Sequence, residues 1–162
     1  MMAWISLGVM LSLVAAQAPV VLDRVLASVG GQLITLSDLR TARGLRLVDG
    51  PDEPALLGVM IERRLVLDEL RRFQVADPEP ALVEGRLNGW AASLGRPRDQ
   101  ALEAADVPLE FVRRWLADDL RREAYVRQRF AALEPERRAE AERQWIDGLR
   151  NRTDVVIRVQ RF

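Results

Sequence analysis

Two short apolar segments flank a pair of glycines near the start of the chain. The first ends at Val29, the second covers residues 33–36, and Gly30 and Gly31 lie between them. Glycine accepts the positive φ angles that a tight hairpin turn requires. The pattern therefore predicts two antiparallel strands joined by a Gly-Gly turn.

The next segments repeat their apolar residues with the period of a helix. Ser37, followed by Asp38, has the chemistry of an N-cap and predicts a helix over residues 38–47. A longer helix is predicted over residues 54–73, and it is apolar on two sides. One side carries Leu56, Val59, Met60, Val66, Leu67, Leu70 and Phe73, and the other carries Leu57, Ile61 and Leu65. A helix with two apolar faces is predicted to lie at the centre of a bundle.

A narrower apolar stripe marks the following helix. Asp77 can cap it and Pro78 can occupy its first position. The stripe consists of Val83, Leu87, Trp90 and Leu94, at spacings of four, three and four residues. Gly95 predicts the end of this helix, and a shorter helix is expected over residues 98–105.

The segment "PLEFVRRWLADDLRREAYVRQRF" gives the strongest helical pattern in the chain. One face carries Leu109, Val112, Leu116, Leu120 and Ala124, with Phe111 and Trp115 beside it. A polar stretch with Pro135 interrupts the pattern. The last predicted helix then carries Trp145, Ile146 and Leu149.

A β-prone segment, "VVIRVQ", covers residues 155–160 close to the C-terminus. It has no local partner, and an isolated hairpin at the N-terminus is marginal in water. Pairing of the two ends satisfies both segments. The predicted fold is therefore mainly α, with a small three-stranded antiparallel sheet made by the N-terminal hairpin and the C-terminal strand. The alternative is that this last segment is a frayed tail.

An apolar stretch from Trp4 to Val14, within a run from Met1 to Leu22 that carries no charged residue, predicts a leader. Its small residues give two cleavage points, after Ala16 or after Ala18, so residues 1–16 are predicted to be a signal peptide. The run is also long enough to cross a bilayer, which leaves an uncleaved membrane anchor as the alternative. Either interpretation places one folded domain, residues 20–162, outside the cytoplasm.

Composition narrows the classes of function. A chain of 162 residues builds one modest core, and its 24 basic residues, all of them Arg, balance 24 acidic ones. This balance favours neither nucleic acid nor an anionic membrane surface as a partner. Without Cys or His, the chain cannot form disulfides, a Cys/His zinc site or a Cys/His catalytic site. We expect no catalytic residues, no metal and no cofactor.

The order of these elements resembles that of a known family. The chain opens with "DRVLASVGGQLITLSDLR", continues with "LLGVMIERRLVLDEL" and "FQVADPEPALVEGRL", and closes with "FVRRWLADDLRREAYVRQRF" and "WIDGLRNRTDVVIRVQ". This arrangement resembles the core of SurA-type periplasmic chaperones, which is built from their N-terminal and C-terminal segments. The resemblance extends from about Leu22 to Gln160 and implies a helical domain of the SurA N-terminal type.

The resemblance implies a periplasmic holdase that works without ATP and binds unfolded exported polypeptides, notably outer-membrane proteins in transit. Most family members also carry a parvulin-type prolyl isomerase domain before the final helix. Here only about a dozen residues, "AALEPERRAEAE", stand at that place, where a domain needs on the order of a hundred. We therefore predict no enzyme activity, and a separate isomerase as an accessory partner. An isomerase remains the least favoured interpretation.

Four side chains are candidate anchors for a client polypeptide: Met60, Trp90, Phe111 and Trp115. Aromatic side chains dominate such contacts, and Met adapts to varied partners. The same four positions also fit a helical core, most clearly Trp90 and Met60. The competing function is a structural or adaptor subunit of a periplasmic assembly, facing the periplasm from the inner membrane if the leader is retained.

Overall fold

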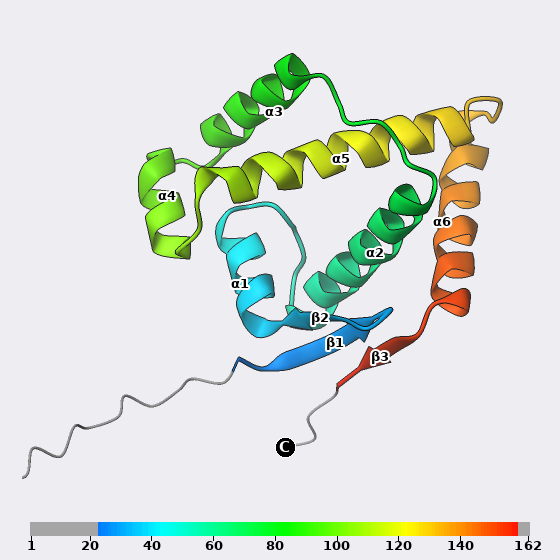
Figure 1. Cartoon of the computed structure of the whole chain (residues 1–162), viewed down its shortest axis with the longest axis horizontal. Coiled ribbons are helices and arrows are strands. Elements are labelled where there is room, and N and C mark those ends of the chain that lie inside the picture. The colour runs from blue at the N-terminus through cyan, green and yellow to red at the C-terminus, as the bar shows by residue number, and fades with distance from the viewer. Residues whose placement is uncertain (1–22, 159–162) are drawn as a thin grey trace, which may run out of the picture.

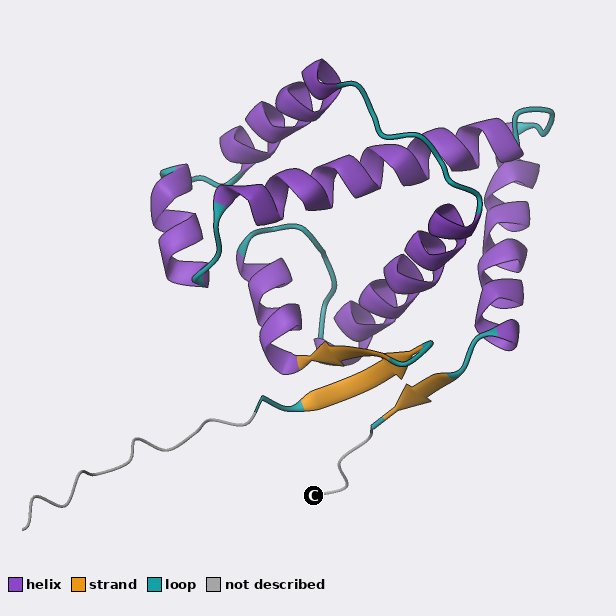
Figure 2. Cartoon of the chain, in the orientation of Figure 1, coloured by secondary structure: helices purple, strands orange, loops and turns teal. Residues whose placement is uncertain are grey.

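The computed structural model describes residues 23–158, which form three strands and six helices (Figures 1 and 2). The strands are β1 (Val25–Val29), β2 (Gln32–Thr35) and β3 (Val155–Ile157). The helices are α1 (Leu36–Gly44), α2 (Glu53–Arg72), α3 (Pro80–Ser93), α4 (Arg98–Ala105), α5 (Leu109–Arg129) and α6 (Pro135–Arg152). The predicted class, mainly α with a small three-stranded antiparallel sheet, is confirmed.

The sheet joins the two ends of the described chain in the order β2-β1-β3, with both pairs antiparallel. Ser28 in the central strand faces Leu33 on one side and Val156 on the other. Gly30 and Gly31 have φ angles of 55° and 81°, which explains why two glycines occupy the turn. In Figure 1 the C-terminal strand lies along β1, as the pairing of the ends predicts. Of the predicted strand 155–160, residues 159 and 160 lie outside the described residues.

Three predicted helix starts differ from the structure by one or two residues, and at α1 the reason is that a different polar side chain caps the helix. Thr35, not Ser37, is the N-cap of α1, and it forms a capping box with Asp38. Asp52 caps α2 by accepting a bond from the backbone N–H of Ala55 at 2.8 Å. The helix expected to begin at Pro78 begins at Pro80, which fixes φ equally well at a first helical position.

Two buried hydrophobic clusters make up the core. The first, here the sheet core, joins the sheet to α1, α2 and α6, and includes Leu65 and Leu149. The second, here the arm core, joins Leu45 to α3, α4 and the first half of α5 around Trp90. Helix α2 contacts β1, α1, α5 and α6, which confirms its predicted central position.

The predicted leader, with its cleavage points after Ala16 and Ala18, lies outside the described residues. Among residues 23–158, none of the helices combines the length and the apolar character that crossing a membrane requires.

Candidate functional site

The apolar stripe of α5 is covered at only one end. Val112 and Leu116 are buried in the arm core, as predicted. Leu120 is only partly buried, and Ala124 is exposed. The helix therefore leaves the cover of α3 and presents the second half of its apolar stripe at the surface.

This uncovered half of α5 forms one wall of a groove, here called the aromatic groove, with a volume of about 720 Å³. The opposite wall comes from the end of α2, the connection to α3 and the start of α3. The larger apolar side chains that line the groove are Phe73, Val75, Pro78, Leu82, Leu120 and Tyr125. Phe73 and Leu82 are 59% and 57% exposed, although both are large apolar side chains. A groove of this size accepts several apolar side chains of a ligand.

Aromatic packing fixes the wall beside Phe73. The rings of Phe73 and Tyr125 stack with centroids 6.0 Å apart, and Tyr125 also contacts Trp145 of α6 at 5.7 Å. The exposed Phe73 thus rests on a ring that is itself packed on the sheet core. This support holds the apolar surface in place without a ligand.

Ion pairs between arginines and carboxylates border the aromatic groove. Arg86 of α3 holds Glu123 of α5 through two bonds of 2.9 and 2.8 Å, and Arg121 lies 3.6 Å from Asp77. The hydrogen bonds from Arg86 lower the pKa of Glu123. Because positive and negative groups are paired, the rim favours no single sign of charge on a ligand.

A second, smaller groove lies between α2 and α5 and has a volume of about 360 Å³. It brings together three of the four predicted anchors, Met60, Phe111 and Trp115, together with Leu67. Met60 is buried in its floor, and Phe111 and Trp115 are partly buried. The guanidinium of Arg63 lies over the Trp115 ring at 3.9 Å from its centroid, and this stacking covers one face of the indole.

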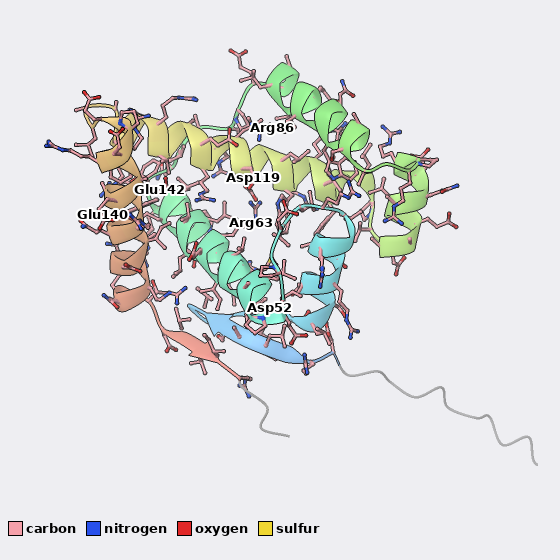
Figure 3. All side chains as sticks on the ribbon, turned by 180° about the vertical axis from the view of Figure 1, so that it is seen from behind. Asp52, Arg63, Arg86, Asp119, Glu140 and Glu142 are labelled. Carbon is pink, nitrogen blue, oxygen red and sulfur yellow. The ribbon has the colours of Figure 1, made fainter. Side chains whose placement is uncertain are left out.

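An ion pair ties the walls of this α2–α5 groove together. Arg63 of α2 bonds to Asp119 of α5, and both residues are labelled in Figure 3. Arg63 also donates to the carbonyl oxygen of Trp115 at 3.0 Å. Burial raises the pKa of Asp119 and lowers the pKa of Arg63, and their mutual attraction opposes both shifts. A partly buried pair of this kind fixes the spacing of the two helices.

The fourth predicted anchor, Trp90, lies in the arm core and is 5% exposed. Its indole Nε1 donates to the carbonyl oxygen of Leu45 at 2.7 Å. This bond joins α3 to the end of α1, and Trp90 lines neither groove. Its surroundings are those of a structural residue.

The residues with the most exposed apolar surface near α5 were absent from the sequence-based candidates. The apolar pattern places Phe73 on the broad apolar face of its helix, but Phe73 is the C-cap of α2 and is largely exposed. Leu82 stands beside, not within, the buried stripe of α3. A large apolar residue that lies outside the buried stripe of its helix is the sequence signal that identifies Leu82 as an exposed apolar side chain.

Within residues 23–158, the structure contains no group of three or more acidic side chains arranged to hold a metal ion. A comparison with family models finds no match to this chain, and no curated protein matches its sequence.

Proposed function

We propose that this chain is a periplasmic holdase of the SurA type that binds unfolded exported polypeptides in the aromatic groove, without ATP and without an isomerase domain. The observation that carries the proposal is the exposure of Phe73 and Leu82 along a groove of about 720 Å³. Exposing two large apolar side chains to water is unfavourable for the free protein. A bound client that covers these side chains removes this unfavourable exposure and so gains binding free energy.

The architecture supports this proposal. The walls of the groove come from α2, α3 and α5, which are anchored in two separate cores, so the surface exists before a client arrives. An extended polypeptide places alternate side chains on one side, and an apolar groove accepts them without reading a particular sequence. The mixed charges of the rim are compatible with varied clients.

The short connection between α5 and α6 supports the absence of an isomerase domain. Helix α5 ends at Arg129 and α6 begins at Pro135, so five residues join them. This connection is far shorter than a catalytic domain of about a hundred residues requires. The proposal accordingly assigns the chain client binding alone, with proline isomerisation left to another protein.

The test is suppression of aggregation of an unfolded outer-membrane barrel protein that is diluted from denaturant. The wild-type chain is expected to keep the client soluble at near-stoichiometric amounts. Phe73→Ser with Leu82→Ser should reduce this protection at least tenfold, because the groove loses its two most exposed large apolar side chains. Val59→Ser is the matched control, since Val59 is an exposed apolar residue of α2 that lines neither groove.

Variants Phe111→Ala and Trp115→Ala test the α2–α5 groove in the same assay, after circular dichroism has shown that they are folded. Loss of protection in these variants alone would move the client site to that groove. A folded wild-type chain that gives no protection at excess contradicts the holdase proposal. The adaptor function, with one dedicated partner, would then take its place.

A further inference from the structure

Strand β3 forms an open edge of the sheet. The order β2-β1-β3 leaves one side of β3 without a partner strand among the described residues. Val156 and Ile157 are 45% and 49% exposed there. Open apolar edges of this kind invite pairing with another strand.

The backbone of β3 presents its free groups at alternate residues. Gly30 donates to the carbonyl oxygen of Asp154 at 2.9 Å, and Arg158 donates to that of Leu26 at 2.8 Å. By the alternation of an antiparallel ladder, Val156 bonds to Ser28 between these two positions. The N–H and C=O groups of Val155 and Ile157 therefore face the open side.

The segment 154–158, Asp-Val-Val-Ile-Arg, is complementary to itself when two copies run antiparallel. If Val156 faces Val156 of the second copy, Val155 faces Ile157 and Asp154 faces Arg158. The residues with free backbone groups then form the hydrogen-bonded pairs, as antiparallel geometry requires. Asp154 and Arg158 are exposed, and within residues 23–158 neither takes part in an ion pair.

We propose that the open edge of β3 binds a second copy of this chain and forms a symmetric dimer with a continuous six-stranded sheet. The two-fold axis passes between the two Val156 side chains. Four backbone hydrogen bonds, two Asp154–Arg158 ion pairs and a strip of Val and Ile side chains hold the copies together. When a segment pairs with the same segment of a second copy across a two-fold axis, both copies use up their binding edge. The assembly therefore stops at a dimer.

The position of β3 makes the edge available for this contact. Arg152, just before the strand, bonds to the buried Glu69 of α2 at 2.5 Å, so the end of α6 is fixed to the sheet core. The strand therefore reaches the edge in a defined register. Because β3 is only three residues long, the contact buries less than the roughly 1,000 Å² of a stable interface, and the dimer is transient.

Disulfide trapping tests the register, because the chain contains no cysteine of its own. Val156→Cys places two thiols opposite each other at a non-hydrogen-bonded pair, where the Cα separation of about 4.5 Å suits a disulfide. The cysteine variant is purified as the cells produce it and is oxidised at a protein concentration of about 100 µM. We expect disulfide dimers to form at least tenfold faster than in two controls, Val59→Cys and Ile157→Cys.

The two controls distinguish disulfides that form because the strands pair in the proposed register from disulfides that form by random collision. Val59 is nearly as exposed as Val156 but lies on α2, and Ile157 faces Val155 of the second copy, so neither places its two thiols opposite each other. Equal rates for all three cysteines overturn the proposal. A rate for Ile157→Cys as high as that for Val156→Cys overturns the register and, with it, the ion pairs.

Charge reversal in the Val156→Cys background tests the ion pairs. Asp154→Arg or Arg158→Asp alone should slow disulfide formation several-fold, since like charges then face each other. The double variant should restore the original rate, and a double variant as slow as either single one contradicts the proposal. A parallel reaction offers an unfolded client with one cysteine. Trapping of this client at residue 156, with no trapping of a second copy, would assign the edge to client strands and overturn the dimer.

Discussion

The two cores of this protein differ in how they are assembled from the chain. The sheet core collects residues from both ends of the described chain, from Leu26 to Leu149, and is closed by pairing of distant strands. The arm core is smaller and is built mainly from consecutive helices, with Leu45 as its contribution from an earlier segment. The free energy of global unfolding should therefore depend on the sheet core. The position of α3 and α4 should depend on the arm core.

Helix α5 contacts both cores, and it lines both grooves. Its first half packs in the arm core through Val112 and Leu116, whereas Tyr125 and Val126 pack against the sheet core. Between these contacts no single core covers the apolar face of the helix. The candidate binding surface is thus a consequence of two cores that remain separate.

The largest expected effect comes from a cavity in the sheet core. Leu65 is 2% exposed at the centre of α2, so Leu65→Ala should cost about 2–5 kcal/mol of the free energy of unfolding. Chemical denaturation followed by circular dichroism measures this loss. Hydrogen exchange should become faster in the sheet and in the arm alike. Exchange that becomes faster only near Leu65 would show that the two cores unfold independently.

A smaller and more local effect is expected in the arm core. Trp90→Phe keeps an aromatic ring but leaves the carbonyl oxygen of Leu45 without its hydrogen bond, which costs about 1–3 kcal/mol. Amide hydrogen exchange read by mass spectrometry should show faster exchange in α3 and α4, with the sheet unchanged. Equal acceleration in β1 would contradict the separation of the two cores.

The smallest effect concerns the ion pair that joins α3 to α5 at the groove rim. Because Arg86 lowers the pKa of Glu123 in the folded state, this pair stabilises the protein above about pH 4.5, the ordinary value for Glu. The contribution is lost as pH falls through the lowered pKa. The pair is exposed, so Glu123→Gln should cost only about 0.2–1 kcal/mol at pH 7. Thermal unfolding at pH 7 and pH 3 should show a smaller difference from wild type at pH 3 than at pH 7.

The fold was largely predictable because burial leaves a periodic pattern. The stripe of Val83, Leu87, Trp90 and Leu94 is buried as predicted, and the helix over residues 98–105 has the predicted bounds. The joining of the chain ends also followed from the sequence, since the hairpin and residues 155–157 had no other partner. Helix starts were less certain, because several nearby polar residues can serve as caps.

The candidate site was only partly predictable, because its surface depends on where covering helices stop. The apolar stripe of α5 runs along the whole length of the helix. Nothing in the sequence of this stripe shows that α3 leaves Leu120 and Ala124 uncovered. Met60, Phe111 and Trp115 do meet at one groove. Trp90 lies apart from both grooves, because the spacing of a stripe does not distinguish a core residue from a ligand contact.

Site-specific photo-crosslinking tests most directly whether the aromatic groove binds unfolded polypeptide. A photoreactive phenylalanine analogue replaces Phe73, the C-cap of α2, in one sample and Val59 of α2 in the other, so that both probes are exposed. With an unfolded outer-membrane barrel protein, we predict crosslinks from position 73 that excess unlabelled client abolishes, and none from position 59. Equal crosslinking at both positions, or none at position 73 in a folded chain, would contradict client binding in this groove.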